Sequence, residues 1–178
     1  MSELVFGKIK GLPVNSNVVT VPAGHTLYAP GHVIQVVQTF KSDNFLTNST
    51  TFVDVPGLTV TITPKSASSK LLVMVSGITG NSSANYGTRL NLLRDGAPIA
   101  QSTNSTGANQ TLQVFSQDVY ATQAVAINYL DSPATTSAVT YKMQLCSFNS
   151  SSNSVWGRQP TGDSYPSSSS IIVMEVAA

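Results

Sequence analysis

Apolar and polar residues alternate one by one along several stretches of this chain, and that pattern restricts its fold more than any other feature. In residues 139–146 (VTYKMQLC) and 58–63 (LTVTIT), every second residue is large and apolar. Successive side chains of a β-strand point to opposite faces, so a period of two places the apolar residues on one face. Both stretches therefore predict strands with one buried face.

Five further stretches predict strands, at residues 33–40, 70–79, 87–94, 124–131 and 170–176. In residues 70–75 and 171–176 the apolar run is almost continuous, which predicts strands that are covered on both faces. Turn signals separate the stretches. Asp95-Gly96 predicts a tight hairpin, whereas Pro56-Gly57 and the segment from Asp131 to Pro133 are expected to end strands.

Many short strands without a long helical pattern predict an all-β fold, an antiparallel β-sandwich that is jelly-roll-like. The length of 178 residues fits one domain, at residues 32–178, preceded by an extended N-terminal arm at residues 1–31 that is rich in Gly and Pro. Charged residues make up 10% of the chain, against roughly 25% in an ordinary soluble domain. With so few charges to keep strand edges apart, we expect the chain to form a closed homo-oligomer.

Several classes of partner are disfavoured. The net charge of +1 with no basic cluster gives no footprint for nucleic acid, and no run of eighteen apolar residues predicts membrane insertion. No glycine-rich loop suggests a nucleotide, so we expect no cofactor. Cys146 lies within an apolar alternation and is expected to be a small buried residue.

Catalytic and metal-binding patterns are missing as well. The two histidines, His25 and His32, have no Gly-x-Ser-x-Gly motif to work with, and they could bind a metal only if symmetry brought copies together on an axis. The carboxylates are scattered singly, so a glycosidase or lyase would need two of them to meet in space or across subunits. We therefore expect a protein that is not an enzyme and holds no metal.

Binding is expected to depend on exposed polar loops, at residues 81–86, 104–109 and 150–165. Residues 147–170 as a whole predict one long loop. Trp156 is the first candidate for contact with a receptor, because an exposed ring there could stack on a sugar; the alternative is that it fills the core. The other contact candidates are Arg158, Asn85, Asn104 and Asn109, with Tyr165, Tyr86 and Arg89 as weaker ones.

From about residue 28 onward the chain resembles a β-rich domain that recurs in tail-fibre and other structural proteins of bacteriophages, especially those of marine and cyanobacterial hosts. The resemblance rests on the order of several short segments over about four-fifths of the chain. These are Pro30–Gln38, Phe52–Val55, Ile62–Pro64, Ser68–Val73, Leu92–Gly96, Tyr129–Pro133, Thr140–Lys142 and Ile172–Val176.

This resemblance implies a jelly-roll-like sandwich, usually a homotrimer, on the outer surface of a virion. We expect a tail-fibre or host-recognition protein, on the tail rather than the capsid, that contacts other virion proteins and a host surface glycan or protein. The alternatives are a capsid or tail decoration protein and an enzyme that degrades polysaccharide. Attachment to the particle is expected through apolar residues of the arm, namely Leu4, Phe6, Ile9, Leu12, Val19 and Val21.

Overall fold

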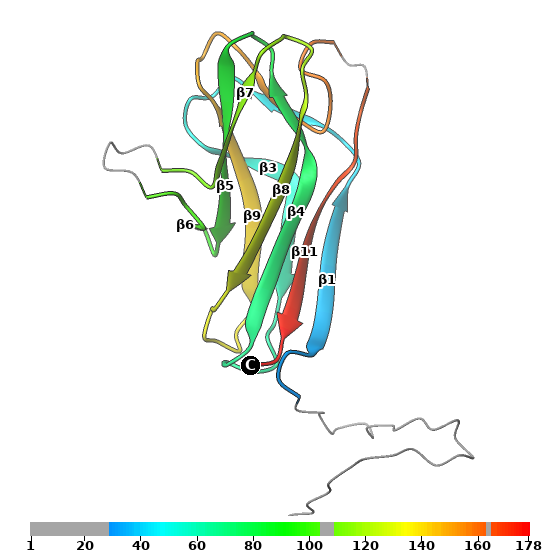
Figure 1. The fold of residues 1–178 in the computed structure, drawn as a ribbon, viewed down its shortest axis with the longest axis vertical. Coiled ribbons are helices and arrows are strands. Elements are labelled where there is room, and N and C mark those ends of the chain that lie inside the picture. The colour runs from blue at the N-terminus through cyan, green and yellow to red at the C-terminus, as the bar shows by residue number, and fades with distance from the viewer. Residues whose placement is uncertain (1–28, 104–108, 163–164) are drawn as a thin grey trace, which may run out of the picture.

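The computed structural model describes residues 29–103, 109–162 and 165–178, and within them the chain forms eleven strands and no helix (Figure 1). All strand pairs are antiparallel. The strands are β1 (Val33–Lys41), β2 (Phe45–Thr47), β3 (Val53–Ile62), β4 (Lys70–Asn81), β5 (Tyr86–Arg94), β6 (Ala97–Ile99), β7 (Leu112–Ser116), β8 (Gln123–Asp131), β9 (Val139–Ser147), β10 (Ser154–Trp156) and β11 (Ser169–Val176).

The strands form two sheets, each four strands wide. In sheet A the order is β1-β11-β4-β8, and in sheet B it is β3-β9-β5 followed by β6 and β7. In sheet A, two short strands continue the lines of longer ones. Strand β10 pairs with β4 just beyond the stretch that β11 occupies, so it extends the line of β11. Strand β2 pairs with β10, and it therefore extends the line of β1, which pairs with β11. Two packed four-stranded antiparallel sheets with this crossing order form a jelly roll, which confirms the predicted fold class.

The core lies between the two sheets, where the inward residues of each strand meet. On β9, Val139, Tyr141, Met143 and Leu145 are all buried, as their alternation predicts. The inward residues of β4 and β11 pack against them from sheet A. Cys146 is buried too, and burial raises the pKa of its thiol, so it stays protonated.

Polar side chains join the two sheets along both open sides of the sandwich. On one side, Gln35 and Thr39 of β1 donate to the carbonyl oxygens of Thr63 and Thr59, each at 2.7 Å. On the other side, Asp131 of β8 accepts a hydrogen bond from the Tyr141 hydroxyl at 2.6 Å and from Arg94 at 2.8 Å. Burial, and then the bond to Asp131, raise the pKa of Tyr141, which therefore remains a neutral donor.

The turns are only partly as predicted. Asp95 and Gly96 adopt φ of 49° and 85° in the β5–β6 hairpin, which the Asp-Gly pair predicts. Pro56-Gly57 does not end a strand, because β3 continues through it with a register shift between Asp54 and Thr59. The expected loop of residues 147–170 contains β10, and three more short strands, β2, β6 and β7, were not predicted.

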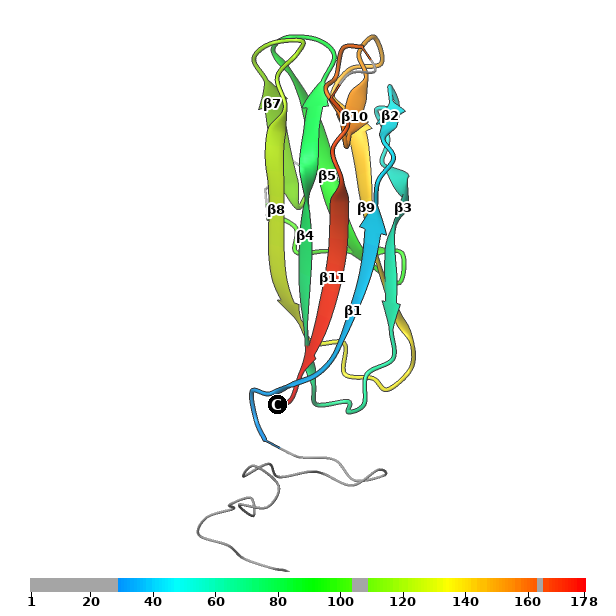
Figure 2. The ribbon, with the colours of Figure 1, turned by 90° about the vertical axis from the view of Figure 1, so that its right-hand side faces the viewer.

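The described chain begins and ends at the same end of the sandwich. The Gly31 N–H donates to the Ala177 carbonyl at 2.8 Å, and the Ala177 N–H donates to the His32 carbonyl at 2.9 Å. The β4–β5, β7–β8 and β10–β11 loops lie at the opposite end (Figures 1 and 2). The twelve residues of β4 connect the two ends, a distance of about 40 Å at 3.3 Å per residue.

Candidate functional site

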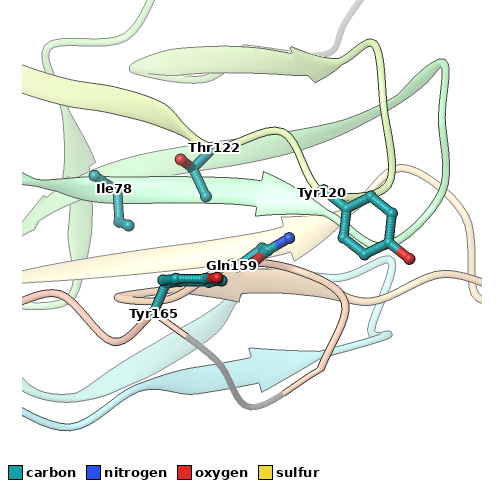
Figure 3. Close-up of a pocket in the computed structure, with 5 residues that line it drawn as sticks. All are labelled: Ile78, Tyr120, Thr122, Gln159 and Tyr165. Atoms are coloured by element: carbon teal, nitrogen blue, oxygen red, sulfur yellow. The ribbon is translucent and has the colours of Figure 1, made fainter.

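Two exposed tyrosines border a hollow at the end of the sandwich far from residues 29–32. Tyr120, 59% exposed, lies in the β7–β8 loop, and Tyr165, 77% exposed, lies in the β10–β11 loop. The hollow has a volume of about 250 Å³ (Figure 3). Ile78, Thr122 and Gln159 line it as well. The described lining thus combines two aromatic rings and one aliphatic side chain with a hydroxyl and an amide, and none of these five residues is charged.

The Tyr120 loop is held by its own turn. The Asp118 carboxylate accepts a hydrogen bond from the Tyr120 N–H at 2.8 Å, and the Ala121 N–H donates to the Asp118 carbonyl at 3.1 Å. Such an Asx turn fixes the backbone without using the tyrosine side chain. The ring is therefore free to face solvent.

The Tyr165 loop is fastened to the Tyr120 loop and to β4. The Thr161 hydroxyl donates to the Val119 carbonyl at 2.8 Å, which joins the two loops directly. Pro160 packs over Gly80, where an added Cβ would lie 2.6 Å from the proline Cγ and 2.5 Å from the Ala121 carbonyl oxygen. Only glycine fits there, because any side chain would push both loops away from β4.

Trp156 supports this end of the molecule from within, which corrects the expectation of an exposed ring. Its side chain is fully buried, and its Nε1 donates to the Ser169 hydroxyl at 2.9 Å. The ring covers Gly77, where a Cβ would lie only 2.6 Å from the indole Cζ2. Of the two interpretations that the sequence left open, the structure therefore supports core filling.

Arg158 is also buried, so it is not available for contact as expected. It is 6% exposed, and its guanidinium donates to the carbonyls of Gln159 and Gly162. These bonds close the turn that leads to Tyr165. Arg158 therefore shapes the loop.

The other predicted contact residues do not join the hollow. Asn85 and Tyr86 are exposed at the start of β5, and Asn109 is exposed beside the β6–β7 loop. Arg89 lies on sheet B, with its guanidinium carbon 5.8 Å and 5.5 Å from the ring centres of Phe52 and Phe148. Asn104, His25 and the six arm residues Leu4, Phe6, Ile9, Leu12, Val19 and Val21 lie outside the described residues.

Sequence reasoning missed Tyr120, which the structure pairs with Tyr165. The two residues are 45 positions apart, and no local pattern links their loops. The Asp118-x-Tyr120 turn was the one available signal, since Asp favours turns that leave the following residues at the surface.

The described carboxylates hold the structure together, and none lines the hollow. Asp54 accepts hydrogen bonds from Lys142 and Gln144, and Asp43 accepts one from Lys41. Bonds from these partners lower the pKa of both carboxyl groups. Across residues 29–103, 109–162 and 165–178, no three histidine, cysteine or carboxylate side chains come together as a metal site.

The same residues include no helix long and apolar enough to cross a membrane.

No protein family and no curated protein matches the chain by sequence. Among solved structures, the chain matches one from the structure of the infectious bursal disease virus Gx strain, with 12% identity and a TM-score of 0.36. The match covers 90% of this chain and 41% of the viral chain, so this chain spans less than half of that chain's length.

Proposed function

We propose that this chain is a non-enzymatic virion structural protein of the tail-fibre type, which binds a neutral glycan on the cell surface through the hollow between Tyr120 and Tyr165. The observation that carries the proposal is the pair of exposed rings around an uncharged lining. A tyrosine offers an apolar face for the C–H side of a sugar and a hydroxyl for its polar rim. The Thr122 hydroxyl and Gln159 amide supply further hydrogen bonds within the hollow.

The lining also favours a binding role over a hydrolytic one. Glycosidic cleavage needs an acid and a second carboxylate about 5 to 10 Å apart across the bond. Among the residues that the structure describes, the five that line the hollow include no carboxylate.

The layout of the sandwich suits attachment at one end and binding at the other. Residues 1–28 join the described chain at the end where Ala177 lies, and the tyrosine loops lie at the opposite end (Figure 1). An arm that docks into another virion protein would leave the hollow pointing away from the particle. We place the protein on the tail, where such a projecting site would meet the host.

Self-association is part of this proposal. The resemblance implies three copies, whereas the apolar outer face of sheet A favours two. The molar mass of the full chain in solution decides between two and three copies. The proposed glycan site lies within one chain, so it does not depend on the number of copies.

Binding to an array of neutral oligosaccharides tests the proposal. Tyr120→Ala and Tyr165→Ala are each expected to weaken binding about tenfold or more, the loss that one stacked ring accounts for. Tyr86→Ala is the matched control, because Tyr86 is exposed at the same end but does not line the hollow. Equal binding by all three variants would contradict the proposed site, and release of shorter oligosaccharides would show an enzyme instead.

A further inference from the structure

The outer face of sheet A is apolar. Its four strands lie side by side in Figure 2, with β8, β4, β11 and β1 in that order. Phe40, Leu130 and Val36 are 63%, 56% and 53% exposed there. Among the outward residues of these four strands, Lys70 is the one charged side chain, and it lies at the margin, where it donates to the Ser132 hydroxyl at 2.8 Å.

The register of the sheet arranges these residues in rows, and two of the three rows described below have the same chemistry when they are read from either edge. The first row runs from β1 to β8 as Val36, Met174, Leu72 and Leu130. Its two outer members, Val36 and Leu130, are both aliphatic, and its two inner members, Met174 and Leu72, are both long apolar side chains. The row is therefore symmetric about a line between β11 and β4.

The second row is Gln38, Ile172, Met74 and Asn128. Here an amide stands at each edge, and an aliphatic pair stands between them. Two amides at mirror positions can form a hydrogen bond with each other, since each has both donors and an acceptor. The second row is thus symmetric about the same line.

The third row is Phe40, Ser170, Ser76 and Ala126. Two serines stand at its centre, and the edges hold one large and one small residue. A hollow of about 240 Å³ opens on this side of the face, lined in part by Ser76, Ala126 and Ser170. At mirror positions, the exposed ring of Phe40 and the hollow around Ala126 complement each other in shape.

We infer that the outer face of sheet A is an interface with a second copy of this chain, related to the first by a two-fold axis that runs parallel to the strands between β11 and β4. Such an axis turns one face onto the other and exchanges mirror positions within each row. Val36 then lies over Leu130, Gln38 over Asn128, and Phe40 over the hollow beside Ala126. Two sheets packed with nearly aligned strands, about 10 Å apart, are a common arrangement.

A second copy fits this face better than another occupant does. A two-fold interface must be complementary to itself, and the three rows meet that condition. The three rows carry no charged side chain, so no like charges meet where the rows of two identical faces pack. If the occupant were a different protein, nothing would require the amides of Gln38 and Asn128 to occupy mirror positions on this face.

The area is sufficient for a reversible dimer. Four strands about 4.8 Å apart and about 8 residues long present a face on the order of 500 Å². Two such faces bury about 1,000 Å² together, near the lower limit for a specific interface. We therefore expect a dimer whose population rises with protein concentration.

The first test is the molar mass of the full chain, measured by light scattering and sedimentation over a range of concentrations. The wild type is expected to approach two copies, and Leu72→Glu is expected to stay at one, because it would place two carboxylates inside the interface. Thr59→Glu is the matched control, since Thr59 is exposed on the outer side of sheet B. Circular dichroism checks the fold, and Leu72→Thr serves if the glutamate variant unfolds.

The second test is cross-linking of paired cysteines, in a Cys146→Ser background, with a short bifunctional maleimide. Phe40→Cys with Ala126→Cys is expected to give a covalent dimer, because these positions meet only between copies; within one chain they are three strands, or about 14 Å, apart. Phe40→Cys with Leu130→Cys is the control. Leu130 lies two rows away from the position that faces Phe40, so this pair should give much less covalent dimer.

Each result decides for or against the inference. A two-copy mass that Leu72→Glu reduces to one, together with selective cross-linking, supports it. A wild type of one copy or of three copies, or equal cross-linking in both cysteine pairs, overturns it and leaves residues 1–28 or another virion protein as the cover. Glycan binding at Tyr120 and Tyr165 is tested separately, because four of the five residues that line the tyrosine hollow lie in loops and none of the five belongs to the three rows.

Discussion

The two sheets of this sandwich share one core but present opposite chemistry on their outer faces. On sheet B, the outward residues of β3 and β9 include Thr59, Thr61 and Lys142, which suit water. On sheet A, the outward residues of the central strands β4 and β11 include Leu72 and Met174, which are apolar. Because both sheets bury their inner faces equally well, stability alone does not require this difference. The outer faces of β3 and β9 thus carry polar and charged residues, and the outer face of sheet A carries the interface that we propose.

Replacing Trp156 by alanine is expected to have the largest effect, since its ring fills the inner side of sheet A over Gly77. Removing a buried tryptophan costs about 3 to 5 kcal/mol. Chemical denaturation of the variant measures the loss, and Tyr165→Ala, at an exposed residue in the loop that follows β10, should cost far less. A Trp156→Ala protein as stable as the wild type would show that the ring is not part of the core.

Leu71 and Leu72 test the two sides of sheet A with neighbouring residues. Leu71 is fully buried between the sheets, and Leu72 points outward. Leu71→Ala is expected to lower the free energy of unfolding by about 2 to 5 kcal/mol. Leu72→Ala should leave a dilute monomer nearly as stable as the wild type and weaken the pairing of copies. Equal losses in dilute solution would mean that the outer face is covered within one chain.

The alternation of side chains made most of this fold predictable. The regular period of two in residues 139–146 predicted a half-solvated strand, and the continuous apolar runs of residues 70–75 and 171–176 predicted strands covered on both sides. In the structure these stretches lie in β9, β4 and β11, and the last two are neighbours in sheet A. Periodicity reports the number of apolar faces of a strand, so it distinguished the two sheets.

The same reasoning failed where a residue's environment comes from distant parts of the chain. The local sequence around Trp156 is polar, and its burial depends on the missing side chain of Gly77, which lies 79 positions earlier. Strand β10 is only three residues long, too short to show a period. The hollow likewise needs Tyr120 and Tyr165 from two loops, and only the folded chain brings them together.

Glu175 provides a test by pH, because it places a carboxylate on the inner side of sheet A. Burial alone raises its pKa, but hydrogen bonds from Gln35 at 2.6 Å and from the Lys65 and Ser66 N–H groups outweigh burial, so the pKa is lowered. A lowered pKa stabilises the fold above the ordinary value of 4.5, and this contribution is lost as the pH falls through the folded-state value.

Glu175→Gln should therefore cost about 1 to 3 kcal/mol at neutral pH, the range for hydrogen bonds to a buried charged group. The variant should also lose less stability than the wild type between neutral and acidic pH. Urea unfolding at several pH values measures both effects. Parallel pH profiles for the two proteins would contradict a role for the Glu175 charge.

The smallest expected effect lies on the outer side of sheet B, at the ion pair of Asp54 and Lys142. The two side chains meet at 2.6 Å, but Asp54 is about half exposed. Exposed pairs contribute about 0 to 1 kcal/mol, and salt screens them. Asp54→Asn should therefore cost less than about 1 kcal/mol in urea, and less still in concentrated sodium chloride. Pairing through sheet A, which has no central charge, should not weaken in the same salt. A cost of several kcal/mol that salt leaves unchanged would mean that sheet B is also shielded from water, and the contrast between the two faces would disappear.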